Sequence, residues 1–403
     1  MNTKRLYFDN VYRTKADAVI LRTDELNENT RLLLDQTIFF PTGGGQSCDL
    51  GFISIDGITY NVIDVYEEDG NIYHVLDAGS KSVKIKPGDK AVMSIDWNRR
   101  FDNMQRHCGE HILSGVIYKL YGGGNNGFHM GDEYITIDIA FDKDSKYRKI
   151  TQEMADEAEI AANKVIWNDD AIHTDFFTDK RDAEKLPLRK HLAFDEDISI
   201  VTIGGYDAPD DCVACCGTHP SSAGQVGLIK IYKVEPNKGM SRIYFEAGMR
   251  AFENYRNQFN ILKKIEFDLS AGDDDILEKY RIQKYKLASK NDELYKIKKA
   301  RNKAEAVNII NSRNDVCIKE YDSLTTNDIL NIGKIVAAHR DDLTILVDLN
   351  SLTVFLFSGG IPNCAAIIAD TAIPLGAKGG GKTTSARATF MDRDSIRKFL
   401  SLF

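Results

Sequence analysis

Two pairs of metal-binding side chains, far apart in the sequence, are its strongest chemical feature. His107 and His111 are four positions apart in a segment with helical periodicity, so both imidazoles should lie on one helix face, one turn apart. Cys215 and His219 repeat this spacing among glycines and a proline, which favour a loop. Three imidazoles and one thiolate are a standard ligand set for zinc. The two pairs together therefore predict one Zn²⁺ per chain, bound by His107, His111, Cys215 and His219.

The segment around the first pair also fits a zinc peptidase. Residues 107–111 read HCGEH, which is the H-x-x-E-H pattern of inverzincins, with Glu110 as the general base. Such a peptidase needs a downstream glutamate as its third ligand, and it leaves Cys215 and His219 without a role. The four-ligand interpretation uses both of them. Separate structural histidines with a buried cysteine are the remaining alternative.

The same motifs resemble those of a known family. The segments HCGEH and CCGTH are similar to the paired HxxxH and CxxxH motifs of the alanyl-tRNA synthetase editing domain and of its free-standing relatives, the AlaX proteins. Many relatives have threonine where this chain has Cys108, and a second thiol there could compete as a ligand. The resemblance covers nearly the whole chain and matches the long AlaX form. The other similar segments are FFPTGGGQSCDLG (39–51), GFHMGDEYITIDI (127–139), SRIYFEAG (241–248) and LGAKGGGKTTSARATF (375–390).

The resemblance implies hydrolysis of the ester that joins a wrong amino acid, serine or glycine, to tRNA(Ala). A synthetase pocket shaped for alanine rejects serine only weakly, by a factor of roughly 10², so a second site must remove the errors. Zinc would activate a water or polarise the ester, and Glu110 would act as general base. His129 falls where relatives keep a polar pocket residue, and it would bind the serine hydroxyl. A non-catalytic tRNA-binding protein with a structural zinc is a further alternative.

A glycine-rich segment near the N-terminus belongs to the same prediction. Glycines allow a backbone to approach a ligand closely, and in relatives this segment lies near the editing pocket. We expect it to form a wall or lid of the pocket, with a structural turn as the alternative. Its residues are Gly43, Gly44, Gly45 and Gln46.

A second glycine-rich segment, GAKGGGKT at 376–383, formally matches a Walker A motif. A Walker A loop needs a strand that leads directly into it, and Pro374 interrupts that lead-in. ATP hydrolysis is therefore disfavoured. We expect instead a flexible loop whose backbone amides, with Lys378 and Lys382, bind RNA phosphates. A structural turn is the alternative.

These residues need several elements to position them, and the pattern predicts a multidomain α+β protein. Alternating residues and the turn signals Asp56-Gly57 and Asp69-Gly70 predict an N-terminal β-barrel-like domain over 1–95. A helix capped by Asp96 and ended by GGGNNG begins an α+β zinc editing domain over 96–248. A helical, coiled-coil-like arm over 249–307 and a C-terminal α/β domain with the glycine-rich loop over 308–403 complete the prediction. The C-terminal domain is expected to serve tRNA binding or dimerisation, and a homodimer would form through it or through the arm.

Charge is distributed unevenly along the chain. The net charge of −8 disfavours non-specific binding of nucleic acid, but residues 279–303 carry ten Lys or Arg against two acidic residues. We expect this basic stripe to bind a polyanion, the body of the tRNA. A merely solvated helix face is the alternative. Within it, Tyr280, Leu287 and Leu294 recur every seven residues, which fits core packing and homodimerisation equally well. The basic residues expected to bind tRNA beside the histidine pair are Arg99, Arg100 and Arg106.

Cysteine usage bears on the cellular compartment. The seven cysteines are an odd number, so they cannot all pair in disulfides, and three of them lie within residues 212–216. This favours metal binding over disulfides. The N-terminus lacks the apolar core of a signal peptide, and no apolar run has the length of a membrane span. We therefore expect a soluble, cytoplasmic protein that does not bind membranes.

Overall fold

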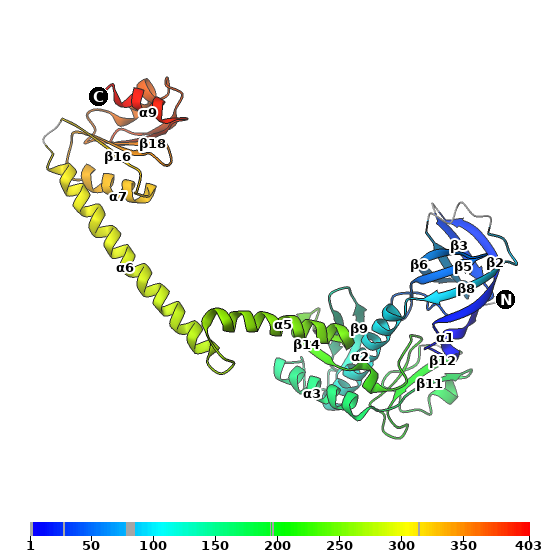
Figure 1. Cartoon of the computed structure of the whole chain (residues 1–403). Helices are drawn as coiled ribbons and strands as arrows, with labels where there is room; N and C mark the ends of the chain where they lie inside the picture. Colours follow the sequence, from blue (N-terminus) through cyan, green and yellow to red (C-terminus); the bar gives the residue numbers. More distant parts are fainter. Residues whose placement is uncertain (1–2, 27–28, 78–84, 194, 196, 313–314) are drawn as a thin grey trace. The chain divides into compact units, whose positions relative to one another are not determined.

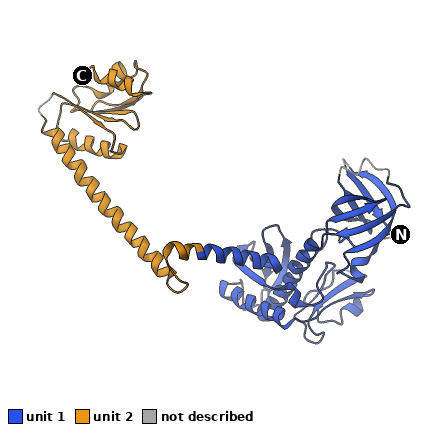
Figure 2. Cartoon of the chain, in the orientation of Figure 1, with its two compact units in different colours: residues 1–263 blue, residues 264–403 orange. Residues whose placement is uncertain are grey.

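Figure 1 shows a computed structural model of the chain, which describes residues 3–26, 29–77, 85–193, 195, 197–312 and 315–403. The chain forms two compact units, residues 1–263 and residues 264–403 (Figure 2). The expected multidomain α+β architecture is confirmed, whereas the finer division at residues 95, 248 and 307 stays a prediction. None of the described helices is both long enough and apolar enough to cross a membrane.

A closed six-stranded barrel occupies the N-terminal part of the first unit, as expected. Every pair of neighbouring strands is antiparallel, in the order β2-β3-β7-β6-β5-β8. Asp56, Gly57, Asp69 and Gly70 all have positive φ, which confirms the two predicted hairpin turns. The strands are β2 (Lys15–Leu26), β3 (Asn29–Leu34), β5 (Gly51–Ile55), β6 (Ile58–Glu68), β7 (Asn71–Leu76) and β8 (Lys90–Ile95); the short elements before and between them are β1 (Lys4–Arg5), α1 (Leu6–Asp9) and β4 (Gln36–Thr37).

The helix that carries the histidine pair is α2 (Trp97–Tyr121), and it begins and ends where the sequence predicts. The Asp96 side chain accepts a hydrogen bond from the Arg99 backbone N–H, and Gly122 ends the helix in the left-handed conformation. Almost every residue from 103 to 117 is buried. Gly109 lets the helix approach Ala247 closely, because a Cβ at position 109 would lie 2.5 Å from the Cβ of Ala247.

Two sheets of the first unit flank α2. A four-stranded antiparallel sheet has the order β14-β15-β10-β9, and a three-stranded one has the order β11-β12-β13. Together with α2 they enclose a continuous core of mostly branched apolar side chains. The elements are β9 (Gly124–Met130), β10 (Ile135–Ala140), α3 (Gln152–Asn168), β11 (Ile172–Phe177), α4 (Lys180–Ala183), β12 (Ile198–Ile203), β13 (Asp211–Ala214), η2 (Ala223–Val226), β14 (Ile229–Asn237) and β15 (Met240–Ala247).

Helices and a five-stranded sheet make up the rest of the chain. Helix α5 (Gly248–Leu269) begins in the first unit, and the second unit contains the long helix α6 (Ile276–Ile310). The sheet order is β16-β17-β18-β20-β19, with only β16 and β17 parallel. The elements are β16 (Val316–Tyr321), α7 (Thr326–Ala337), β17 (Leu343–Asp348), β18 (Thr353–Phe357), α8 (Cys364–Ile367), η3 (Ile368–Ala372), β19 (Lys378–Lys382), β20 (Ser385–Thr389) and α9 (Arg393–Leu400).

The structure corrects the flexible loop predicted for the second glycine-rich segment. Residues 378–382 form β19, an edge strand that pairs with β20. A Cβ at Gly379 or Gly381 would collide with the β20 backbone, so these glycines serve strand pairing rather than mobility. The next element is a strand rather than the helix that a Walker A motif requires. Lys378 and Lys382 stand exposed at the two ends of β19.

The heptad residues of α6 are exposed. Tyr280, Leu287 and Leu294 have exposed fractions of 55%, 62% and 49%. Core packing against another helix of the described chain does not account for their spacing. The coiled-coil arm and the homodimer stay predictions.

Candidate metal centre

The fold brings the two predicted pairs of ligands together. His107 and His111 project from one face of α2, while Cys215 and His219 lie in the loop that follows β13. One donor atom from each of the four lies within 4.8 Å of the others. The Cys215 Sγ is 3.4 Å from His107 Nε2 and 3.7 Å from His219 Nε2. Spacing this close suits a single bound cation, since Zn²⁺ takes such ligands at about 2.0–2.3 Å.

Hydrogen bonds fix the rings of the two α2 histidines. The Nδ1 of His107 is 3.0 Å from Gln46 Oε1, and the Nδ1 of His111 is 3.0 Å from Asp211 Oδ2. Both rings therefore present Nε2 as the atom available to a metal. The Nε2 of His111 is buried, and it has no hydrogen-bond partner among the described residues. A cation that accepts the lone pair of this nitrogen would satisfy it, so the donor set fits a metal ion.

The thiol of the cluster is poised to be a thiolate. Burial alone would raise the pKa of Cys215, but the imidazoles of His107, His219 and His111 lower it well below its usual range. Burial would likewise raise the pKa of Asp211, but hydrogen bonds from His111 and Arg189 keep it low. Both groups are therefore anionic near neutral pH, which favours a bound cation.

Gln46 links the N-terminal glycine-rich segment to the ligand loop. Its Nε2 donates to Thr218 Oγ1 at 2.8 Å, and its Oε1 accepts from the Thr218 backbone N–H at 3.1 Å. Gly43 and Gln46 close a turn through two backbone hydrogen bonds. Gly45 packs so tightly that a Cβ would lie 2.5 Å from the Phe128 ring. This segment was expected to wall the pocket, but only Gly44 lines the cavity beside the cluster; Gln46 instead positions a ligand.

A cavity of about 250 Å³ adjoins the cluster, and Glu110 lies in its wall. The Oε1 of Glu110 accepts hydrogen bonds from Ser114 Oγ at 2.6 Å and from Asn125 Nδ2 at 2.7 Å. Its Oε2 lies 3.9 Å from His111 Nε2. The carboxylate is thus held next to the metal position with one oxygen available, as a general base requires.

The structure does not bring His129 to this cavity. Its neighbour on β9, Phe128, stacks on His107 with ring centroids 5.4 Å apart. Adjacent strand residues point to opposite faces, so His129 is directed away and is exposed. It is not in the lining of the cavity, and its predicted contact with the serine hydroxyl has no support here. Cys108 is likewise outside the group of donor atoms that converge, and it packs in the apolar core instead.

The arginines beside the histidine pair also require a correction. Arg100 is fully buried, with its Nε 2.9 Å from Asp49 Oδ2, and Arg106 is buried with its Nε 2.7 Å from Glu246 Oε1. Arg99 is half-buried and donates to the Cys48 carbonyl. Arg100 and Arg106 therefore join α2 to the barrel side and to β15, and they are unavailable to tRNA phosphates. The sequence cannot show this, because their carboxylate partners are distant along the chain.

The sequence interpretation missed three candidate functional residues. Asp211 orients His111, Asn125 orients Glu110, and Arg189 binds Asp211 through Nη2 at 3.1 Å. Local sequence does not distinguish Asp211 from Asp210, which is partly exposed and pairs with Lys119. Only the fold determines which of the two adjacent carboxylates is buried.

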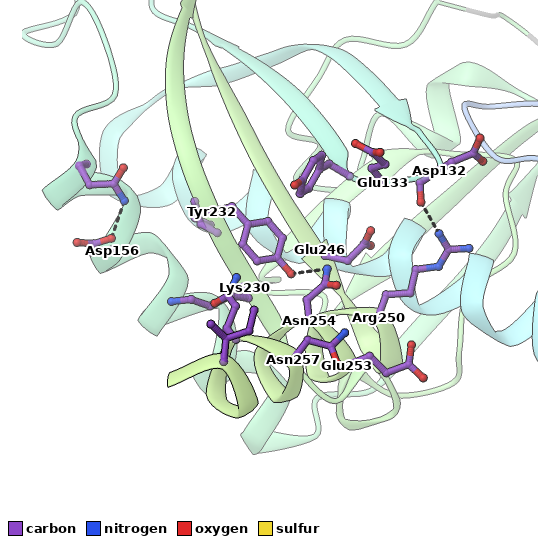
Figure 3. Close-up of a pocket in the computed structure, with 15 residues that line it drawn as sticks. Asp132, Glu133, Asp156, Lys230, Tyr232, Glu246, Arg250, Glu253, Asn254 and Asn257 are labelled. Carbon is purple, nitrogen blue, oxygen red and sulfur yellow. Dashed lines mark hydrogen bonds between the residues drawn. The ribbon is translucent and has the colours of Figure 1, made fainter. Parts of the chain in front are cut away.

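A larger cavity, about 940 Å³, lies elsewhere in the first unit (Figure 3). Its wall contains none of the four cluster residues. Arg250 there pairs with Asp102 and donates to the Asp132 carbonyl, and Asn254 donates to Tyr232. Acidic side chains outnumber basic ones in its lining. It is therefore an unfavourable surface for a polyanion.

Two family models and several known proteins match this sequence. A family model described as tRNA synthetases class II (A) matches residues 8–99, and one described as threonyl and alanyl tRNA synthetase second additional domain matches residues 198–244. Alanyl-tRNA editing protein AlaX-L of Pyrococcus horikoshii is 34% identical over 251 residues, which cover 62% of this chain and 59% of that protein.

Alanine–tRNA ligases are similar as well. The enzyme of Ignicoccus hospitalis is 30% identical over 282 residues, 69% of this chain and 29% of the ligase. That of Methanococcoides burtonii is 26% identical over 99% of this chain and 44% of the ligase. The chain thus spans about three fifths of AlaX-L and less than half of these ligases. The resemblance seen in the motifs is confirmed, and the chain is a relative of the alanyl-tRNA editing protein AlaX-L and of the alanine–tRNA ligases.

Proposed function

We propose that this chain is a trans-editing deacylase that hydrolyses the ester of tRNA(Ala) mischarged with serine or glycine. The observation that carries the proposal is the convergence of His107, His111, Cys215 and His219 within 4.8 Å from two distant segments. The name of its relative AlaX-L points to the same activity. A peptidase of the inverzincin type would leave the thiolate and the fourth donor unexplained.

The four side chains would hold one Zn²⁺. When bound there, zinc supplies Lewis acidity that favours attack on an ester carbonyl. The chain's own residues do the positioning. Gln46 and Asp211 hold the two α2 imidazoles, and the low pKa of Cys215 keeps its thiol deprotonated.

Glu110 would take the proton of the attacking water. Ser114 and Asn125 fix Oε1 by hydrogen bonds, and among the described residues Oε2 faces the His111 Nε2 at 3.9 Å. The 250 Å³ cavity beside this carboxylate has room for a small aminoacyl ester. A fixed carboxylate in such a site contributes through proton transfer in the transition state.

The tRNA body would bind elsewhere. The basic stripe on α6 (residues 279–303) and the exposed Lys378 and Lys382 on β19 are the proposed phosphate contacts. Homodimerisation through the exposed heptad positions of α6 is the proposed assembly.

The proposal is tested by incubating purified protein with Ser-, Gly- and Ala-tRNA(Ala), with and without a chelator. We expect release of serine or glycine, sparing of alanine, and loss of activity with chelator or in Cys215→Ala. Release from none of the three substrates would overturn the deacylase. Full deacylase activity of Cys215→Ala would show that the reaction does not need the four-ligand site.

A further inference from the structure

Two cations line the cavity beside the metal cluster, and the chemistry proposed above uses neither of them to bind substrate. Arg189 and Lys190 belong to the segment between α4 and β12, and both lie in the wall of the 250 Å³ cavity with Glu110 and Cys215. They also line a neighbouring cavity of about 390 Å³, together with Tyr118. The pair therefore borders both spaces.

Arg189 is a buried cation with an unused donor. Its side chain is only 5% exposed, and its Nε and Nη2 donate to the Asp211 carboxylate. Its Nη1 is buried and has no hydrogen-bond partner among the residues that the structure describes. A buried N–H of a charged group is costly when no acceptor satisfies it. An acceptor from a bound molecule would remove this cost.

Lys190 adds a second positive charge at the next position. Within the described part of the chain its ammonium has no ion-pair partner, whereas Lys185 pairs with Asp182 at 2.6 Å. Lys190 is exposed, and its side chain lines both cavities, so its ammonium is accessible to a ligand there. Asp211 already accepts two hydrogen bonds from Arg189.

We propose that Lys190 and the Nη1 of Arg189 form an anion subsite for a phosphodiester group of the substrate. This inference rests on the proposed function, in which the ester is attached to the terminal ribose of a tRNA. The phosphodiester on the 5′ side of that ribose is the nearest obligatory negative charge. Guanidinium and ammonium groups are the usual protein donors to phosphate. The shared border between the two cavities would place the ester in one and the preceding nucleotide in the other.

The test uses two non-hydrolysable ligands, 3′-deoxy-3′-(serylamino)adenosine and the same compound with a 5′ methyl phosphodiester. Calorimetry gives their dissociation constants with the full chain, with Lys190→Gln, and with Lys185→Gln as the matched control. We expect the wild type to bind the phosphodiester ligand at least about tenfold more tightly than the nucleoside, as a charge-assisted contact allows. Lys190→Gln should lose most of this ratio at unchanged metal content, Lys190→Arg should restore part of it, and Lys185→Gln should keep it.

A ratio near one in the wild type, or an unchanged ratio in Lys190→Gln, would overturn the subsite. Failure to bind either ligand would overturn it as well. The proposed function fails separately: a protein that shows the expected ratio but does not hydrolyse Ser- or Gly-tRNA(Ala) retains the subsite and loses the deacylase. A protein that hydrolyses them with a ratio near one retains the deacylase and loses the subsite.

Discussion

At the residue scale, the candidate site depends on the nitrogen of each imidazole that faces away from the cluster. Gln46 and Asp211 hold the Nδ1 atoms of His107 and His111 by hydrogen bonds. The orientation of each ring is therefore fixed before a metal binds, with Nε2 directed into the cluster. The carboxylate of Asp211 also makes the imidazole of His111 more basic, and Arg189 donates a hydrogen bond to that carboxylate. The affinity of the cluster for a metal should therefore depend on residues that do not touch it.

We expect Asp211→Asn to weaken Zn²⁺ binding by roughly 10–100-fold, the usual cost of losing a carboxylate behind a metal-binding histidine. Competition with a chromophoric chelator at fixed pH measures it. Asp210→Asn is the matched control, because that neighbouring carboxylate pairs with Lys119 and has no contact with the ligands. Equal affinities for the two variants would show that Asp211 does not support the metal.

Replacing Glu110 with glutamine should separate catalysis from metal binding. The amide is isosteric, and its oxygen can still accept from Ser114 and Asn125. Zn²⁺ content should stay at the wild-type value, while kcat for deacylation falls by roughly 10²–10⁴, as expected when a general base is lost. Metal analysis and single-turnover hydrolysis of Ser-tRNA(Ala) provide the two measurements. Unchanged hydrolysis with full metal content would exclude Glu110 from the mechanism.

Which residues the sequence could identify follows from how local their signals are. The four residues of the cluster could be predicted because their spacing of four is visible in each pair, and the structure brings their donor atoms together. The tRNA-binding roles predicted for Arg100 and Arg106 were wrong. Both side chains are buried in ion pairs with Asp49 and Glu246, which lie far away in the sequence. His129 was misplaced for a related reason: one step along β9 changes the face on which a side chain lies.

At the scale of elements, α2 shows how local and distant determinants combine. Its first and last residues follow from Asp96 and Gly122, which act within one turn, so the sequence predicted both ends. Strand β19 was predicted as a loop because glycines weaken strand propensity, and only the partner strand β20 explains their presence. The close approach of α2 to β15 at Gly109 had no sequence signal at all.

Gly109→Ala should therefore destabilise the protein although alanine favours a helix by about 1 kcal/mol over glycine. The added methyl would lie 2.5 Å from the Cβ of Ala247, and overpacking of a tight core costs roughly 1–3 kcal/mol. Thermal unfolding should show a lower Tm for this variant. The double variant Gly109→Ala, Ala247→Gly should recover part of the loss, and Gly205→Ala, at an uncrowded position, serves as control. A higher Tm for Gly109→Ala alone would mean that the helix can move away from β15.

At the scale of the whole molecule, the candidate metal cluster and the basic stripe of α6 belong to different units. The metal cluster and its cavity lie in residues 1–263, while the basic stripe on α6 lies in residues 264–403. Within the stripe, Lys279 and Lys296 pair with acidic neighbours, whereas Lys284, Lys286 and Lys290 are exposed. The proposed function therefore assigns the ester to the first unit and phosphate contacts to the second.

Replacing Lys284, Lys286 and Lys290 with glutamine should then weaken tRNA binding without changing hydrolysis of a short aminoacyl-nucleotide ester. Each lost phosphate contact removes the release of a bound counterion, so the slope of log K against log salt should become less steep by up to about 0.7–0.9 per lysine. Filter binding of tRNA(Ala) between roughly 50 and 200 mM salt measures the slope. The control replaces Lys15, Lys86 and Lys90, which are exposed on or beside the barrel, and leaves the net charge of the two variants equal. An identical slope for both triple variants would show that total charge, rather than the α6 stripe, governs binding, whereas a change confined to the α6 variant would place the tRNA backbone on that helix.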